Sequence, residues 1–509
     1  MLQNFLDTFI PQVKKKSRQN NLATWILETT GNEDAAVLKA DLDTEYRLLF
    51  NHRENYERLL NFAPQDPLLK RQQNVLIRMH KPYLIPSDLL ENLSKKEAEL
   101  SLLYSNFRPE LNGELLSENK IREILKKEKD VAKRKDTWEA SKQIGKVLAP
   151  RILELVELRN EAAKSLGYSD YFSFQLELQE VDDAWLFKTF DQLAIDSETA
   201  YIEVLNEINE GAKKTFSTHE IGPWAWSDPF CQEDPLDASE LDHLVAEINL
   251  LQASCEFYQN MGFDVKELLS RGDHFERKGK NQHAFCLSID REKDVRILNN
   301  IKPTIKWLET VLHELGHGVY DLGYEASLPW LLKEPPHMIT TEAMALLAGR
   351  QAYRMRSLAA IAPLSSPKLR KKAEISLRRR QLIFSRWVLV MTHFEKELYQ
   401  NPLQNLNQLW WNLVKKFQKI ESSGSKNGAD WAAKFHIGLA PAYYFSYLLG
   451  ELLASTLEEK LQEISFQDFG IFLQDKLFKP GNRFHWNELI EYATGEKLSP
   501  VAWLKQFKA

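Results

Sequence analysis

The segment His313-Glu314-Leu315-Gly316-His317 constrains this chain more than any other feature of its sequence. On an α-helix, two residues four positions apart differ by about 40° around the axis and by about 6 Å along it, so both imidazoles can converge on one metal ion. Residues 307–312 contain good helix formers without Gly or Pro, and they follow Pro303, a helix-entry signal. The sequence therefore predicts a helix that carries a metal site.

The carboxylate of Glu314 adds a reaction to this site. Glu314 lies about 100° around the helix from His313, so it is poorly placed as a ligand but well placed beside a coordinated water. Zn²⁺ lowers the pKa of such a water to about 7, and a neighbouring carboxylate can then take its proton at neutral pH while the ion polarises a carbonyl. This combination indicates hydrolysis of an amide bond.

A tetrahedral zinc site of this kind needs a third protein ligand and an open position. Residues 338–348 are apolar nearly all round, which predicts a buried helix carrying one carboxylate, Glu342. An unpaired charge in such a place is costly, and a metal is the usual compensation. The alternative is that Glu342 is exposed or pairs with Arg350 or Arg354 on the same helix. We predict Glu342 as the third zinc ligand.

Composition favours a large helical core. The chain has 509 residues, 43% of them hydrophobic, with only 20 Gly and 20 Pro, and no linker or low-complexity run divides it. We therefore expect a single unit over 1–509, with a helical lid or scaffold over 1–130 and a catalytic region over 131–509. The net charge of −6, with both signs mixed, argues against nucleic acid or an anionic membrane as a partner.

The ends and the cysteines of the chain bear on its location. The first residues lack the basic start and apolar core of a secretory signal, and the three cysteines show no CxxC spacing. Residues 435–454 are apolar but contain Pro441 and Glu451, so we do not expect a membrane span there. We expect a cytosolic protein, and the sequence leaves its oligomeric state open.

Two patterns of periodicity divide the rest of the chain. Apolar residues recur at helical spacing over 34–63, 67–104 and 118–165, which predicts amphipathic helices of a scaffold or lid. Residues 283–289 and 294–298 instead suit strands and flank a polar turn. A hairpin just before the zinc helix offers an edge on which a peptide main chain can pair.

A second cluster, KFHIGLAPAYYFSY, occupies residues 434–447. Here the chain resembles the angiotensin-converting-enzyme family of zinc peptidyl-dipeptidases, closest in style to its bacterial members. That family has a K-[FY]-H-[IV] segment followed by a Pro and by two tyrosines three apart, which correspond to Pro441, Tyr444 and Tyr447. The family also has His-Ala thirty residues before the first zinc histidine, where this chain has His283-Ala284. LRNEAAKSLGY and TTEA are further anchors, and the resemblance spans roughly residues 100 to 460.

The resemblance implies a fold and an activity. The fold is all-α and two-lobed, with a deep central cleft and a small β-hairpin beside the zinc helix. The activity is zinc-dependent removal of dipeptides from the C-terminus of short peptides, with Glu314 as general base and later as proton donor to the leaving amine.

The resemblance also implies roles for single residues. His436 would bond the substrate carbonyl beside the scissile bond, and Tyr447 would donate to the tetrahedral oxyanion, a contact worth about 3 kcal/mol. His283 and Ala284 would touch the substrate near the cleaved bond. Taken singly, such residues are more often core aromatics or structural histidines, and the joint spacing favours the functional interpretation.

Recognition of the peptide's C-terminal carboxylate is assigned by the same resemblance to Lys434 and Tyr444. The interval after His436 is one residue longer than in the animal enzymes, so Tyr443 is an alternative to Tyr444. The family's carboxylate-binding Gln has no counterpart in residues 223–227, PWAWS. Dipeptide release is therefore a weaker expectation than peptidase chemistry.

Other departures leave alternatives open. The family's Asp four residues after the glutamate ligand is Leu346 here, and Asp321, one turn after His317, is a weak candidate to orient a ligand. The same site would also serve an endo-oligopeptidase or a carboxypeptidase. A zinc-containing protein that binds peptides without cutting them is a further alternative, against which the intact Glu314 argues.

Overall fold

The computed structural model describes residues 2–217, 221–236, 239–355, 358, 366–422 and 428–508. The chain forms two compact units, and each unit is built from three separate stretches of the sequence. The first unit comprises Met1–Leu84, Ala238–Glu374 and Leu449–Trp503, and the second comprises Ile85–Asp237, Ile375–Leu448 and Leu504–Ala509. Three of the boundaries fall inside helices, namely α16 (Pro367–Gln400), α19 (Phe445–Glu463) and α22 (Val501–Lys505). The division at residue 130 stays a prediction.

The other elements of the first unit are mostly helices. In chain order they are α1 (Leu2–Thr30), α2 (Glu33–Leu48), α3 (Arg53–Asn61), α4 (Pro67–His80), η1 (Lys81–Tyr83), η3 (Ser239–Leu244), α12 (Leu250–Asn260), α13 (Lys266–Ser270), β3 (Phe285–Ser288), β4 (Val295–Leu298), α14 (Ile305–Leu322), η4 (Trp330–Leu332), α15 (Met338–Arg354), α20 (Phe466–Phe472), η6 (Leu473–Phe478), η7 (Gly481–Arg483) and α21 (Trp486–Thr494).

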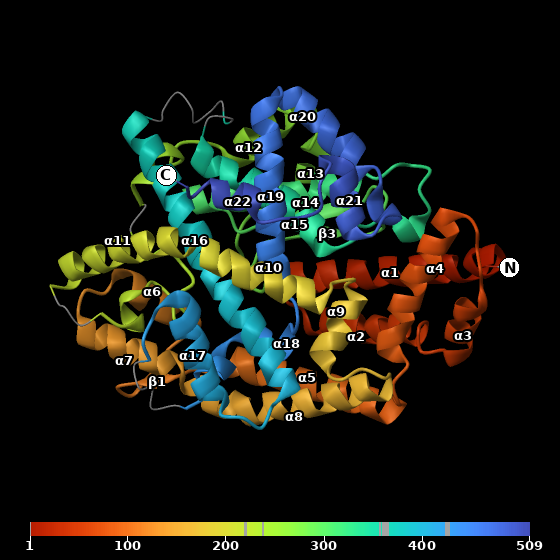
Figure 1. The fold of residues 1–509 in the computed structure, drawn as a ribbon, viewed down its shortest axis with the longest axis horizontal. Helices are drawn as coiled ribbons and strands as arrows, with labels where there is room; N and C mark the ends of the chain where they lie inside the picture. The colour runs from red at the N-terminus through yellow and green to blue at the C-terminus, as the bar shows by residue number, and fades with distance from the viewer. Residues whose placement is uncertain are drawn as a thin grey trace. The chain divides into compact units, whose positions relative to one another are not determined.

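The second unit is built in the same way. Its other elements are α5 (Ser87–Asn106), β1 (Glu110–Leu111), β2 (Glu114–Leu115), α6 (Glu118–Lys127), α7 (Val131–Ser141), α8 (Gln143–Ser165), α9 (Tyr171–Leu178), α10 (Asp183–Asp196), α11 (Glu198–Phe216), η2 (Pro223–Ala225), α17 (Leu406–Gln418), η5 (Asp430–Ala433) and α18 (Phe435–Leu439). Helices thus make up most of each unit (Figure 1), and the predicted all-α class is confirmed.

The predicted hairpin before the zinc helix is also confirmed. β3 and β4 pair antiparallel, with Phe285 opposite Leu298 and Ser288 opposite Val295, and both strands contact α14. The sequence analysis missed β1 and β2, whose turn contains Asn112 and Gly113, both at positive φ. An Asn-Gly pair is the usual signal for such a tight hairpin, because both positions of the turn require positive φ.

The amphipathic periodicity of the N-terminal segments corresponds to several shorter helices. Residues 34–63 contain most of α2 and all of α3, residues 67–104 contain α4 and most of α5, and residues 118–165 contain α6 to α8. Pro86 occupies the cap position before α5, consistent with the low tolerance of a helix interior for proline.

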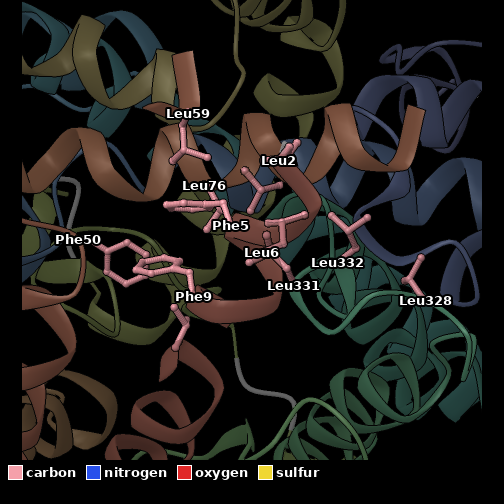
Figure 2. Close-up of a cluster of buried hydrophobic side chains, with 12 residues drawn as sticks. Leu2, Phe5, Leu6, Phe9, Phe50, Leu59, Leu76, Leu328, Leu331 and Leu332 are labelled. Atoms are coloured by element: carbon pink, nitrogen blue, oxygen red, sulfur yellow. The ribbon is translucent and has the colours of Figure 1, made fainter. Parts of the chain in front are cut away.

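A hydrophobic cluster joins the N-terminal helices to the segment between α14 and α15. Figure 2 shows Phe5, Leu6 and Phe9 of α1 gathered with residues of η4, of which Leu331 and Leu332 are fully buried. Each such side chain contributes about 1.5–3 kcal/mol when fully buried. Because η4 lies between the two helices that carry the predicted zinc ligands, this cluster fixes the connection between them.

Two further expectations concern the environment of the protein. No helix in the described ranges combines the length and the apolar character that a bilayer span requires. The three cysteines are free thiols, and Cys231 is buried.

Candidate active site

The helix that carries both predicted histidine ligands is α14. It begins after the cap residue Thr304, whose hydroxyl accepts the Trp307 N–H at 3.3 Å, and Asp242 accepts the Ile305 N–H at 2.9 Å. These side chains satisfy backbone donors that the first helical turn leaves open. The predicted helix is thus confirmed. Its first turn is capped both by the adjacent Thr304 and by Asp242, which is distant in the sequence.

The second ligand helix, α15, packs directly on α14. Gly316, the glycine of the His-Glu-Leu-Gly-His segment, lies at the contact. A Cβ at this position would stand 2.7 Å from the Ala345 Cα and 3.2 Å from the Met344 carbonyl oxygen. Only glycine lets the two backbones approach this closely, so the segment's fourth residue sets the distance between the helices.

The three predicted ligands lie together. The Nε2 atoms of His313 and His317 are 3.3 Å apart, and the His313 Nε2 is 3.8 Å from the Glu342 Oε2. One ligand atom from each of the three residues falls within 4.8 Å of the others, so the group can hold a metal ion. Two atoms at about 2.1 Å from a tetrahedral zinc ion would lie about 3.4 Å apart, which matches the distance between the two histidine nitrogens.

The protonation of these side chains suits a metal. Burial lowers the pKa of His313 to about 4 and that of His317 well below its usual value, so both rings are neutral at pH 7. A neutral imidazole is the form that binds zinc. The Glu342 Oε2 is buried and has no hydrogen-bond partner among the described residues, and a cation there would satisfy it.

The alternative pairing of Glu342 with an arginine on its own helix is not observed. The Arg350 guanidinium contacts Glu451 and donates to Glu458 at 3.1 Å, and Arg354 donates to Glu458 at 2.8 Å. Burial, and then the charge of Glu451, raise the pKa of Glu342 to about 7. A divalent cation beside Glu342 would reverse this shift by stabilising the ionised form.

A threonine, and not Asp321, contacts the second histidine. The His317 Nδ1 lies 2.7 Å from the Thr341 Oγ1, whereas Asp321 accepts a hydrogen bond from the Tyr324 hydroxyl at 2.8 Å. The sequence analysis was therefore wrong to consider Asp321 for this role. The available signal was the hydroxyl directly before Glu342, on a helix whose other side chains are mostly apolar.

Glu314 lies next to the three-residue cluster. Its side chain is nearly buried, and burial followed by the charge of Glu342 raises its pKa to about 8, while the backbone of Cys286 opposes the shift. Cys286 belongs to β3, so the hairpin backbone contacts the predicted general base. The predicted substrate residues His283 and Ala284 directly precede β3, and the His283 side chain is exposed.

The residues of the second sequence cluster lie in the second unit. Lys434 is buried, and its ammonium faces the rings of Phe230, Trp387 and Tyr444, at 5.3, 5.1 and 5.5 Å from their centroids. Burial lowers its pKa to about 8, and the charge of Asp228 is the main opposing effect. Lys434 is thus a buried cation and not a solvated surface group.

The amide oxygen of Gln232 accepts a hydrogen bond from the Lys434 Nζ at 3.0 Å. The sequence analysis had found no counterpart of the family's carboxylate-binding Gln in residues 223–227. The structure brings a glutamine to Lys434 from five residues beyond that segment. No local pattern marks Gln232, because its position depends on a loop that contacts Lys434, the residue before α18, across 202 residues of sequence.

The aromatic residues of this cluster contact one another. The Tyr444 hydroxyl accepts from the Trp387 indole at 3.0 Å, and its ring lies 4.9 Å from that of His436 and 5.4 Å from that of Tyr447. The Tyr443 ring packs on Tyr447 at 5.2 Å. Since the Lys434 ammonium faces Tyr444, the geometry favours Tyr444 over Tyr443 as the partner of the lysine.

In comparisons with known proteins, two family models match separate parts of the chain. Residues 1–201 match the peptidase M2 family, described as angiotensin-converting enzyme, and residues 266–509 match peptidase family M3. Both are families of zinc-dependent metallopeptidases.

Curated relatives share low identity with the chain. The angiotensin-converting enzyme-like protein Ace3 of Mus musculus is 24% identical, over 96% of this chain and 72% of its own length. The angiotensin-converting enzyme of Haematobia irritans exigua is 22% identical, over 72% of this chain and 66% of its own. The angiotensin-converting enzyme-related protein of Drosophila melanogaster is 23% identical, over 44% of this chain and 40% of its own length. The chain thus spans less than two thirds of the latter two relatives.

The helical fold, the His-His-Glu cluster and the family matches together support a zinc metallopeptidase that acts on peptides. Within that class, the matches confirm the resemblance to the angiotensin-converting-enzyme family.

Proposed function

We propose that the protein hydrolyses short peptides and releases dipeptides from their C-termini, with zinc held by His313, His317 and Glu342. The Lys434 ammonium carries the C-terminal part of this proposal, because among the described residues the hydrogen bond recorded for it is the one to the Gln232 amide oxygen. A buried ammonium has three donors, and the ring faces that surround it supply no conventional acceptor. A peptide carboxylate is the kind of group that would complete its hydrogen bonds.

The chemistry of the first unit follows from the position of Glu314. A zinc ion in the three-residue cluster would polarise the scissile carbonyl and acidify a water. The Glu314 carboxylate takes the water's proton and later gives it to the leaving amine. Its burial favours proton uptake, since desolvation makes a carboxylate more basic.

By resemblance, Tyr447 donates a hydrogen bond to the oxyanion and His436 bonds the substrate carbonyl. The contact of both rings with Tyr444 supports a shared role, because one polar cluster then includes the oxyanion donor and the carboxylate-binding residues. His283 and Ala284 would bind the substrate main chain. β3 pairs only with β4 among the described strands. On its other edge the Cys286 backbone contacts Glu314 and the Ser288 oxygen accepts from Asn21, so we assign main-chain pairing with an extended peptide to His283 and Ala284, just before the strand.

Mass spectrometry of the products from a mixed peptide library tests this function. Dipeptides from the C-terminus support it, and single residues or internal fragments would indicate a carboxypeptidase or an endo-oligopeptidase. Absence of any cleavage by the zinc-loaded protein, with peptide binding retained, would indicate the non-catalytic alternative.

We also propose a cytoplasmic location. The three free thiols are consistent with a reducing compartment, where disulfides are rare. Cell fractionation with antibody detection checks this, and recovery of the protein outside the cytoplasm would contradict it.

A further inference from the structure

The loop that carries Gln232 runs from Asp228 to Glu233 in the second unit. It is irregular, and yet Asp228 is fully buried and Cys231 is nearly so. Cys231 adopts a φ of 54°, in the left-handed region that a residue other than glycine rarely occupies. Such a conformation persists only when the surrounding structure determines it.

The backbone donors of this loop converge on one carboxylate. Asp228 accepts the Phe230 N–H at 2.8 Å on one oxygen, and it accepts the N–H groups of Gln232 and Glu233, both at 3.0 Å, on the other. A carboxylate that accepts several backbone N–H groups holds them at fixed angles to one another. Asp228 therefore fixes the backbone on both sides of Cys231.

The carbonyls of the loop are held from the opposite direction. The Pro229 oxygen accepts from the Trp138 indole at 3.0 Å and from Lys142 Nζ at 2.7 Å. The Gln418 amide donates to the oxygens of Phe230 and Cys231, at 3.1 and 2.9 Å. The loop is thus held through side chains of α7, of Lys142 between α7 and α8, and of α17.

This loop presents two groups to Lys434. The Gln232 amide oxygen accepts from the ammonium, and the Phe230 ring lies beneath it. The Gln232 amide nitrogen remains as a donor, so the Gln232 and Lys434 side chains together offer donors of the kind that a carboxylate accepts.

We propose that Asp228 is a positioning residue for recognition of the peptide's C-terminal carboxylate. It does not contact the substrate. It fixes the loop of residues 228–233 so that Gln232 and Lys434 are aligned before the peptide binds, which reduces the ordering cost of binding. This inference rests on the proposed function of Lys434.

The experiment compares two matched peptides, one with a free C-terminal carboxylate and one with a C-terminal amide. Cleavage of both is measured as kcat/KM, and the ratio is the readout. In Asp228→Asn, an NH₂ group replaces one acceptor oxygen and opposes the backbone N–H groups. We expect the preference for the free carboxylate to fall by about tenfold or more, mainly through KM, since one hydrogen bond to a charged group is worth this much.

A matched control separates positioning from general destabilisation. Asp170 is also buried in the second unit and accepts a backbone N–H, from Ser173 at 2.8 Å, at the start of α9. Asp170→Asn should leave the carboxylate preference unchanged, whatever its effect on thermal stability. In a Gln232→Leu background, Asp228→Asn should reduce the preference little further, because it acts through Gln232.

The outcomes separate the two proposals. A wild-type protein that cleaves both peptides equally well would refute carboxylate recognition itself, and this inference with it. A wild-type preference that survives in Asp228→Asn would overturn the role of Asp228 and leave the proposed function intact. If Asp228→Asn does not fold, Gln418→Met releases the same loop from its carbonyl side, and an unchanged preference there would equally overturn the inference.

Discussion

The His317 Nδ1 and the Thr341 Oγ1 lie 2.7 Å apart, so a hydroxyl from α15 orients a ring on α14. A partner on Nδ1 fixes which nitrogen carries the proton and leaves Nε2 free to bind a metal. His317 Nε2 is the atom that faces His313.

Replacing Thr341 with Val should therefore weaken zinc binding by about ten- to a hundredfold. Competition with a chromophoric chelator measures this directly. Thr340→Val is the matched control, because the Thr340 hydroxyl contacts His337 and Tyr320 and neither predicted histidine ligand. Equal zinc affinities of the two variants would show that the Thr341 contact has no role at the metal.

The purified protein should contain about one zinc ion per chain and lose peptidase activity on chelation, because three protein ligands leave one position open. Metal analysis and activity before and after chelation check this. His317→Ala should lose the zinc, whereas His243→Ala, which changes an exposed histidine in the same unit, should keep it. Full activity in chelator would contradict the prediction.

Glu314→Gln should retain zinc and peptide binding but lose nearly all turnover, since the change removes the base and no ligand. Rates are measured at saturating peptide, with metal content and binding determined on the same preparation. Turnover close to that of the wild type would mean that another group takes the proton.

Tyr447→Phe should lower kcat by about a hundredfold with little change in KM, because a hydrogen bond to an oxyanion forms mainly in the transition state. Tyr443→Phe is the control, since the Tyr443 ring packs on Tyr447 and the same hydroxyl is removed one turn away. A larger loss of kcat in Tyr443→Phe than in Tyr447→Phe would indicate that Tyr443, and not Tyr447, donates to the oxyanion.

The buried Glu395 predicts a pH dependence of stability. It accepts the Ala442 N–H at 2.9 Å, directly before the tyrosine segment, and burial raises its pKa to about 8 from an ordinary value of 4.5. Between these values the folded protein holds a proton that the unfolded chain has released. This contribution to stability is therefore complete below about pH 4.5 and is lost as the pH rises to about 8.

Glu395→Gln removes this titration and keeps a neutral acceptor for Ala442. Its thermal midpoint should rise relative to the wild type as the pH increases from 5 to 8. Glu397→Gln, on the same helix, serves as the control. A difference between Glu395→Gln and wild type that stays constant with pH would exclude Glu395 as the titrating group.

The sequence predicted best those features that depend on spacing along one helix. His313 and His317 share a face at i and i+4, and the apolar surroundings of Glu342 mark it as a buried charge, so their proximity in the structure could be anticipated. The hairpin before α14 follows from β-rich runs around a polar turn in the same way.

The contacts that the sequence did not reveal join residues of separate elements. Gln232 reaches Lys434 only because of the Asp228 loop, and no periodicity describes that loop. Thr341 was overlooked because a threonine within an apolar helix is equally compatible with a bond to its own backbone. Both cases depend on tertiary packing and not on local propensity.

The close approach of α14 and α15 at Gly316 bears on the structure of the metal-free protein. The helices that carry the ligands meet through backbone atoms at Ala345, and so their spacing does not depend on a cation bridging them. The apoprotein should then be a preformed host into which other divalent ions can be exchanged. Zinc has no d–d absorption, whereas the d–d bands of cobalt report its coordination geometry. Exchange of cobalt into the site would therefore allow metal binding to be followed by visible spectroscopy.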